Sequence, residues 1–174
     1  MQYPVNNPRD TVAGLLITLS PDGADYFMAT HQPAKAYYSR DNASGRHTTV
    51  GGGIEDGETP LQAMRRELEE EYGKNFAGNC RIDELSAVKP TIRQSISGDW
   101  KRYHSLLIIL QANVEPEVDP EEVVPYSFTW HPGDLVESPT GVIHLPQYKR
   151  HLMDTALAAA KELRPDLFAR AKTG

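Results

Sequence analysis

A glycine-rich turn followed by a strongly acidic helix constrains this 174-residue chain more than any other feature. The segment from Gly51 to Lys74 reads GGGIEDGETPLQAMRRELEEEYGK, and its helical part carries Glu67, Glu70 and Glu71. The spacing of i, i+3 and i+4 places the three charges on one face, where like charges destabilise a helix. Hard divalent cations such as Mg²⁺ bind carboxylate and carbonyl oxygens. The segment therefore predicts a cation site of the kind that neutralises charge and activates water in reactions of phosphates.

Capping residues mark the two ends of this helix. Thr59 is a favourable N-cap, Gln62 completes a capping box, and Pro60 loses no hydrogen bond at the first helical position. Gly73 is suited to end the helix with a left-handed backbone. Apolar side chains at helical spacing predict the buried stripe, which consists of Leu61, Met64, Leu68 and Tyr72.

An ordinary solvated face is the alternative explanation of the acidic residues, because Glu is a strong helix former. Neighbouring residues favour a site instead. Glycines 51–53 permit close approach of backbone, Glu58 lies on the turn, and Arg66 can hold a carboxylate through a two-pronged fork. Arg65 and Glu69 point away from the acidic face and are expected in solvent.

The same residues resemble the Nudix box, which would span residues 52–74. Its fixed positions are occupied by Gly52, Glu58, Arg66, Glu67, Leu68, Glu70, Glu71 and Gly73. Lys74 departs from the pattern, since the family usually has an aliphatic residue there, and local packing at the helix end is expected to differ. The resemblance implies an α/β protein with the Nudix fold, in which a mixed β-sheet is sandwiched between α-helices (α/β/α).

The resemblance also implies hydrolysis of a diphosphate linkage in a nucleoside diphosphate joined to a group X, with Mg²⁺, or alternatively Mn²⁺, as cofactor. It implies that Glu67 and Glu71 bind the metal, with Glu70 as a further ligand or as the base. The backbone carbonyl of Gly51 would be an added ligand.

Residues beside the metal ligands are expected to orient those ligands or to activate water. The resemblance gives Arg66 and Glu58 an orienting role. In the family a further glutamate often comes from a loop after the box, and the acidic loop at residues 115–122 offers Glu122 and Glu121, and more weakly Glu115 and Glu117. For any single one of these glutamates a solvated loop charge is the favoured alternative, and the base is then expected in the helix, at Glu70 or Glu67.

The identity of the group X stays open. Candidate phosphate contacts are Lys35, Arg40, Arg46, Lys101 and Arg102, and candidate stacking residues are Tyr37, Tyr38, Trp100 and Tyr103. Pro90 falls near a proline associated with ADP-ribose hydrolases, and the triple glycine is similar to that of diphosphoinositol polyphosphate hydrolases. The six histidines show no metal-binding spacing and are expected in solvent or in the core.

Other functions on the same fold are also considered. A catalytically silent domain that binds a nucleotide and regulates another process has no reason to retain Arg66 and the glutamates. A hydrolase of non-nucleotide diphosphates such as inositol pyrophosphates is a second alternative. An isomerase of isoprenoid diphosphates would need a well-placed cysteine, whereas Cys80 lies in a predicted loop.

The rest of the chain is expected to complete one domain over residues 1–174. The net charge of −6 argues against general nucleic-acid binding. No apolar run is long enough to cross a membrane, no N-terminal signal is evident, and the single cysteine suits a reducing, cytoplasmic setting. A small-molecule nucleoside diphosphate derivative is the expected partner, and a homodimer stays open.

Hydrophobic patterns and turn residues predict the remaining elements. Strands are expected at residues 11–20, 25–30, 47–50, 81–95, 100–114 and 126–130, and a turn at residues 132–135. A last helix is expected at residues 146–163, with an apolar stripe of Tyr148, Leu152, Ala156, Ala159 and Leu163.

Overall fold

The computed structural model describes residues 3–34, 47–85, 88–95, 98–138, 145 and 147–168, apart from the side chains of 147–149. Within these residues, the fold is built on one seven-stranded sheet. Its strands are β1 (Arg9–Leu19), β2 (Tyr26–Thr30), β3 (Gly51–Gly53), β4 (Cys80–Glu84), β5 (Thr91–Gln94), β6 (Trp100–Leu110) and β7 (Thr129–Pro132).

The sheet is mixed, and two long strands form its centre. The order is β4-β6-β1-β2-β7, with β3 also paired to β1 and β5 also paired to β6. β1 and β6 run parallel, whereas the other pairs are antiparallel. A parallel pair needs a long crossover connection, and here the connection carries the acidic helix.

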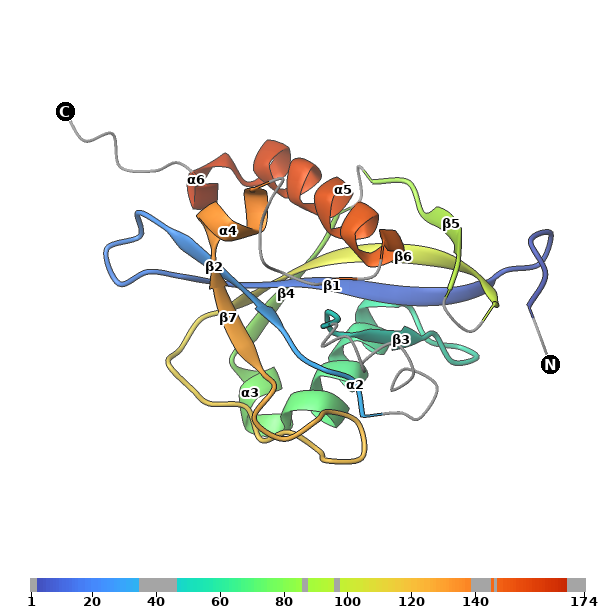
Figure 1. The fold of residues 1–174 in the computed structure, drawn as a ribbon, viewed down its shortest axis with the longest axis horizontal. Helices are drawn as coiled ribbons and strands as arrows, with labels where there is room; N and C mark the ends of the chain where they lie inside the picture. The colour runs from blue at the N-terminus through green and yellow to red at the C-terminus, as the bar shows by residue number, and fades with distance from the viewer. Residues whose placement is uncertain are drawn as a thin grey trace.

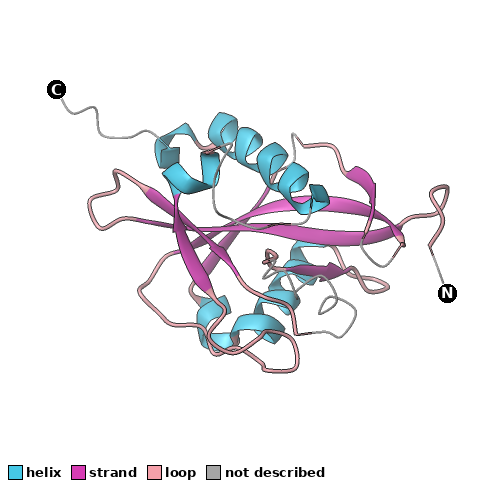
Figure 2. Cartoon of the chain, in the orientation of Figure 1, coloured by secondary structure: helices cyan, strands magenta, loops and turns pink. Residues whose placement is uncertain are grey.

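Helices cover both faces of the sheet (Figures 1 and 2). One side carries α2 (Pro60–Tyr72) and α3 (Lys74–Gly78), and the other side carries α4 (Gly133–Glu137), α5 (Gln147–Leu163) and α6 (Pro165–Phe168). This is the α/β/α sandwich predicted from the sequence. None of these helices is long and apolar enough to span a bilayer.

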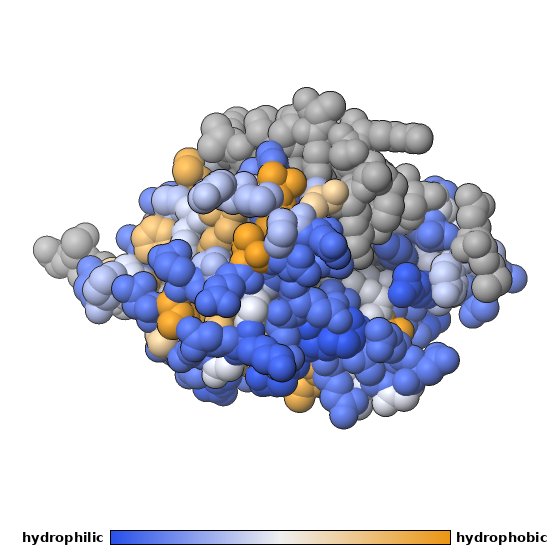
Figure 3. Space-filling model, turned by 90° about the horizontal axis from the view of Figure 1, so that it is seen from below, coloured by the Kyte–Doolittle hydropathy of each residue, from blue (hydrophilic) through white to orange (hydrophobic). Residues whose placement is uncertain are grey.

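Two hydrophobic clusters fill the layers between sheet and helices. Because successive strand residues face opposite sides, Val12 and Leu16 of β1 pack toward α2, whereas Leu15 and Ile17 pack toward α5. Burial on both faces explains why β1 is apolar almost throughout its length. The molecule seen from the α2 side is mainly hydrophilic, with a few hydrophobic residues scattered over it (Figure 3).

The strand predicted at residues 81–95 is two strands, β4 and β5. Both pair with β6, through Glu84↔Leu106 and Thr91↔Tyr103. Between these two pairings β6 offers only residues 104 and 105, and the described residues Leu85 and 88–90 do not belong to a strand. Pro90, which has no backbone N–H to donate to the ladder, lies between the two strands.

Three other elements lie at positions that differ from the predicted ones. The strand expected at 47–50 consists of the glycines 51–53, and the strand expected at 126–130 begins at Thr129 and ends at Pro132. Tyr126 lies in a turn with a φ of 66°. The turn predicted at 132–135 is the start of α4, where Gly133 packs so closely on Tyr26 that a Cβ would lie 2.6 Å from the ring.

The last helix forms within the predicted range, but its buried stripe is rotated. Leu152 and Ala156 are buried as expected. Ala159 and Leu163 are not, and their places in the core are taken by Met153, Leu157 and Ala160. The side chain of Tyr148 lies outside the described residues.

Candidate active site

Helix α2 is fixed at its N-terminus and along one face. Both bonds of the predicted capping box are present: the Thr59 hydroxyl accepts from Gln62 N at 3.2 Å, and the side-chain oxygen Oε1 of Gln62 accepts from Thr59 N at 2.9 Å. Met64, Leu68 and Tyr72 are fully buried, whereas Leu61 is 37% exposed and does not belong to the stripe. This packing determines which side chains of α2 face the sheet.

The C-terminal end of α2 differs from the prediction. Gly73 has the expected positive φ of 86°, but its ψ of 157° is extended rather than left-handed helical. The chain then continues into the short helix α3, which starts at Lys74. Lys74 is exposed, whereas Phe76 and Ala77 of α3 are buried, so they supply the apolar packing that Lys74 does not.

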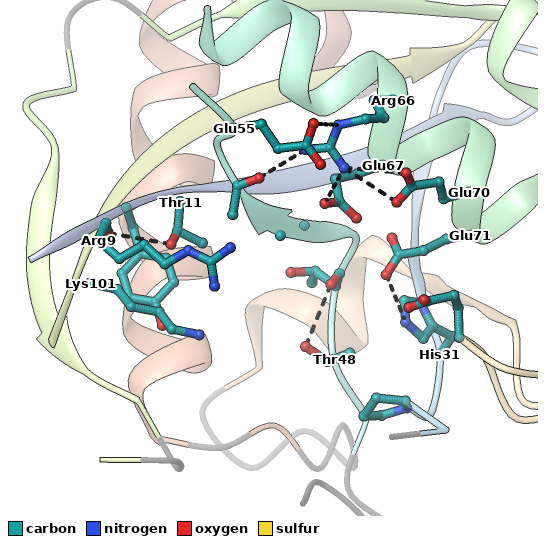
Figure 4. Close-up of a pocket in the computed structure, with 17 residues that line it drawn as sticks. Arg9, Thr11, His31, Thr48, Glu55, Arg66, Glu67, Glu70, Glu71 and Lys101 are labelled. Carbon is teal, nitrogen blue, oxygen red and sulfur yellow. Dashed lines mark hydrogen bonds and ion pairs between the residues drawn. The ribbon is translucent and has the colours of Figure 1, made fainter. Parts of the chain in front are cut away.

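A polar cavity of about 280 Å³ is lined by residues of α2, of the glycine strand β3 and of the first parts of β1 and β6 (Figure 4). Glu67 and Glu71 line it and are only 9% and 7% exposed. Glu70 also lines it but is exposed, and Gly51 contributes backbone. Arg65 and Glu69 are exposed, as predicted. Two carboxylates are thus held at the sheet side of α2 at the expense of their hydration.

The three glycines of β3 have no side chains, so neighbouring groups can pack closely against this strand. A Cβ on Gly52 would overlap the Glu67 carboxylate, and one on Gly51 would overlap the backbone carbonyl of Val12. A Cβ on Gly53 would overlap the Arg9 guanidinium. A side chain at Gly51 would meet backbone, whereas one at Gly52 or Gly53 would displace the end of the Glu67 or Arg9 side chain.

Arg66 connects the turn, the strand and the helix. Its Nε and Nη2 atoms bind the two oxygens of Glu58 at 2.9 and 3.0 Å, and Nη2 also donates to Gly53 O at 2.9 Å. Nη1 donates to Glu67 Oε1 at 2.9 Å and approaches Glu70 Oε2 at 3.3 Å. The fork expected from the sequence is therefore formed, and it is directed at Glu58.

The ion pair changes the protonation behaviour of both partners. The hydrogen bonds from Arg66, and after them the backbone N–H of Glu55, hold the pKa of Glu58 below its usual value. The hydrogen bond to Glu58 in turn raises the pKa of Arg66 well above its usual value. Arg66 and Glu58 are therefore both charged in the folded protein at neutral pH.

Two basic side chains lie on the other side of β3 from the acidic residues of α2. Arg9 of β1 and Lys101 of β6 are direct neighbours in the parallel ladder, as are Thr11 and Tyr103 two residues further on. All four line the cavity. The guanidinium of Arg9 also lies 5.8 Å from the ring centroid of Tyr3. Figure 4 shows Arg9 and Lys101 separated from the acidic side chains of α2 by β3.

His31, like Arg9, is a residue of this site that the sequence did not reveal. It follows β2, is fully buried, and is fixed by backbone hydrogen bonds in both directions with Thr48. Its Nδ1 lies 2.6 Å from the hydroxyl of Tyr72, and its Nε2 lies 3.7 Å from Glu71 Oε1. The only sequence signal was its position at the end of a predicted strand.

The acidic loop brings one of its glutamates to the cavity. Glu122 lines it, whereas Glu121 is exposed and does not. Glu117 lies at the end of α2, where its N–H donates to Tyr72 O at 2.9 Å. Glu115 lines a separate hollow at the opposite end of β1 and β6. Of the four candidates, only Glu122 is placed for a role in this site.

Only some of the candidate substrate-binding residues line the cavity. Lys101 and Tyr103 line the cavity, whereas Arg102 binds Asp10 at 3.0 Å and Trp100 does not line the cavity. Lys35, Tyr37, Tyr38, Arg40 and Arg46 lie outside the described residues.

Cys80 is not in the cavity. It begins β4 rather than lying in a loop, is buried, and donates its thiol to Phe76 O. Burial raises the pKa of this thiol to about 12. A buried, protonated thiol remote from the cavity does not fit an isomerase that uses a cysteine.

The donor chemistry of the acidic side fits a hard divalent cation. Glu67, Glu70, Glu71 and the carbonyl groups of β3 offer the oxygen ligands that Mg²⁺ prefers. Among the described residues, however, no three side chains of His, Cys, Asp or Glu already form a cluster able to hold a metal. Arg66 bonds to both Glu67 and Glu70, which accounts for part of this arrangement.

Comparison with known proteins identifies the family. Residues 8–152 match the model of the NUDIX domain, which is most of the chain. The chain belongs to the Nudix family. Its membership confirms the resemblance seen in residues 52–74 and supports pyrophosphohydrolase activity on phosphoric anhydrides. No curated protein matches this Nudix protein.

Solved structures share the Nudix fold at low sequence identity. A C. elegans Ap4A hydrolase in a binary complex is 14% identical, with a TM-score of 0.63 over 86% of this chain and 96% of that one. The NUDIX domain of Shewanella oneidensis NrtR, crystallised with ADP ribose, is 16% identical, with a TM-score of 0.60 over 87% of each chain. The E. coli dihydroneopterin triphosphate pyrophosphohydrolase is 17% identical, with a TM-score of 0.55 over 82% and 92%. At such identities the similarity shows the fold alone.

Proposed function

We propose that this Nudix protein is a Mg²⁺-dependent hydrolase that cleaves a diphosphate linkage in a nucleoside diphosphate joined to another group. The observation that carries the proposal is the division of charge across one cavity. Glu67 and Glu71 are almost buried on one side of β3, and Arg9 and Lys101 face the cavity from the other side. The first pair suits a cation and the second suits phosphate oxygens.

The residues of the acidic side are assigned to the metal. Glu67 and Glu71 would hold Mg²⁺, or Mn²⁺ in its place, with Glu70 and the Gly51 carbonyl as further ligands. A bound divalent cation supplies charge neutralisation at the phosphates and lowers the pKa of a water ligand. The chain itself supplies a rigid helix whose packing determines where the carboxylates lie.

Two residues are assigned to orientation and two remain candidates for the base. Arg66 and Glu58 hold the turn, β3 and Glu67 in one arrangement, because the same guanidinium binds all three. Glu70 contacts Arg66 and lies at the open side of the cavity, where it can reach solvent water. Glu122 enters from the acidic loop. Either one can accept the proton of an attacking water.

The test is a metal-dependent product assay on a panel of phosphoric anhydrides. The proteins of similar fold suggest Ap4A, ADP-ribose and a pterin triphosphate as members, beside nucleoside triphosphates, nucleotide sugars and inositol pyrophosphates. Turnover of a nucleotide member supports the proposal. Turnover of inositol pyrophosphates alone would favour the non-nucleotide alternative, and tight binding without turnover would favour a silent regulator.

Variants of α2 determine whether the activity belongs to this site. Glu67→Gln and Glu71→Gln should each lower kcat about a hundredfold or more, because each removes a charge at the metal. Glu69→Gln is the matched control, since Glu69 lies on the same helix but is exposed. Without metal, the thermal stability of Glu71→Gln should be equal to the parent or higher, because like charges repel, whereas Glu67→Gln also loses the ion pair with Arg66. Normal turnover by either variant would disprove that assignment.

A further inference from the structure

A buried chain of three side chains leads from the core to the carboxylate of Glu71. The Tyr72 hydroxyl lies 2.6 Å from His31 Nδ1, and His31 Nε2 lies 3.7 Å from Glu71 Oε1 (Figure 4 shows the second contact). Tyr72 and His31 are fully buried and Glu71 is 7% exposed. Contacts between charges and dipoles are stronger here than in water, because the surroundings have a low dielectric constant.

The chemistry of Tyr72 determines which nitrogen of a neutral His31 carries the hydrogen. A phenol, with an ordinary pKa of about 10, is protonated at neutral pH, and it can donate to Nδ1, which leaves the hydrogen on Nε2. The other tautomer would direct the lone pair of Nε2 at the negative Glu71. In the imidazolium form Nε2 also carries a hydrogen. In each favourable state, therefore, an N–H of His31 faces Glu71.

The backbone of His31 is held by hydrogen bonds as well as its side chain. His31 and Thr48 exchange hydrogen bonds of 3.0 and 2.7 Å in an isolated bridge that leads directly to the glycine strand. The ring also packs edge-on against Tyr72, with centroids 5.5 Å apart and an interplanar angle of 84°. His31 therefore has little freedom to leave Glu71.

We infer that His31, held by Tyr72, is a positioning residue that orients the Glu71 carboxylate for binding a divalent cation. The inference rests on the proposed function, in which Glu71 is a metal ligand. The distance of 3.7 Å is longer than a hydrogen bond, so the contact acts through the attraction between the N–H and the carboxylate. A carboxylate has two oxygens, so attraction of Oε1 to His31 is compatible with cation binding through Oε2.

The experiment measures binding of Mn²⁺ alone, without substrate, by the loss of the free-ion EPR signal. His31→Asn places an amide near Nδ1, beside Tyr72, but cannot reach Glu71, whereas His31→Gln places an amide near Nε2. We expect His31→Asn to weaken Mn²⁺ affinity about 10- to 100-fold, as is typical for groups that orient metal ligands. His31→Gln should recover much of the loss. Tyr72→Phe should weaken affinity about two- to tenfold, the equivalent of one hydrogen bond.

Activity provides a second readout that a purely structural role would not give. The metal concentration for half-maximal rate should rise in His31→Asn, while kcat at saturating metal returns towards the parent value. Thermal unfolding of the metal-free proteins reports any loss of packing separately. A fall in stability shared by His31→Asn and His31→Gln, with Mn²⁺ affinity unchanged, would contradict the inference.

Glu71→Gln separates this inference from the proposed function. If Glu71→Gln weakens Mn²⁺ binding and His31→Asn does not, the positioning role is wrong and the metal site stands. If Glu71→Gln binds Mn²⁺ like the parent, the assignment of Glu71 as a ligand is wrong, and the role of His31 with it. Should His31→Asn fail to fold, Tyr72→Phe decides, and parental Mn²⁺ affinity in that variant would overturn the inference.

Discussion

Gly52 and Glu67 lie so close together that a Cβ on the glycine would overlap both carboxylate oxygens of the glutamate. Gly52 belongs to β3 and Glu67 to α2, so their contact is where the acidic helix meets the sheet. Gly52 is needed here for space rather than for an unusual φ, because only Gly23, Gly57, Gly73 and Gly98 have positive φ among the described glycines.

We expect Gly52→Ala to lower kcat about a hundredfold, because a displacement of roughly 1 Å at a reacting group costs about that much. The added methyl group must push the Glu67 carboxylate away from its present place. Gly78→Ala is the control, since a Cβ there meets no atom within 4 Å. Steady-state kinetics at saturating Mg²⁺ would measure both, and full activity in Gly52→Ala would show that the position of Glu67 is not critical.

Arg66→Lys tests whether the fork or only the charge matters. Lysine keeps the positive charge but cannot bind Glu58, Glu67 and Gly53 together, because it lacks the planar guanidinium. Activity should fall about ten- to a hundredfold, the range for a hydrogen bond between charged groups. Arg65→Lys, at an exposed position of the same helix, should have no effect. Equal activity of the two variants would mean that the positive charge is sufficient.

The Arg66–Glu58 pair also predicts a dependence of stability on pH. The pKa of Glu58 in the folded protein is lower than its ordinary value of 4.5. The pair therefore stabilises the fold above about pH 4.5, and this contribution is lost as the pH falls through the lowered pKa. The difference in melting temperature between the parent and Glu58→Gln should thus shrink on acidification. A difference that stays constant from neutral pH to below the lowered pKa would contradict this.

The sequence predicted the parts of the site that are local in the chain. The Thr59 cap and a fork from Arg66 to a carboxylate depend on one turn and one helix, for which residue spacing is sufficient information, although the structure was needed to show that the fork is directed at Glu58. The positions of Arg9 and His31 depend instead on strand pairing. Arg9 meets Lys101 through the β1–β6 register, which no local pattern encodes.

The element boundaries failed for a related reason. Residues 81–95 were expected to form one strand, but they pair with β6 in two separate parts, residues 80–84 and residues 91–94. The stripe of α5 shifted because the sheet surface selects Met153, Leu157 and Ala160 from several nearly equivalent apolar faces. Helical periodicity alone does not distinguish those faces.

Arg9→Gln and Lys101→Gln should each raise KM about tenfold for a phosphate-bearing substrate with a smaller effect on kcat. Each removes a charged contact to phosphate that is made in the ground state and the transition state alike. Arg93→Gln is the control, because Arg93 lies exposed in the neighbouring strand β5 and does not line the cavity. The increase in KM should become smaller in high salt, because salt screens exposed charges. An unchanged KM in both variants would exclude a role in phosphate binding.

A pH–rate profile of Glu122→Gln beside Glu121→Gln tests the base. Glu122 lines the cavity and Glu121, its neighbour in the same loop, is exposed and does not. If Glu122 accepts the proton of water, its variant should lose the acidic limb of the profile and about 10²- to 10⁴-fold in kcat. Glu121→Gln should keep the parent profile, because its side chain lies outside the cavity. If both variants keep the parent profile and rate, the base lies on α2, where Glu70 reaches solvent at the open side of the cavity and Glu67 does not.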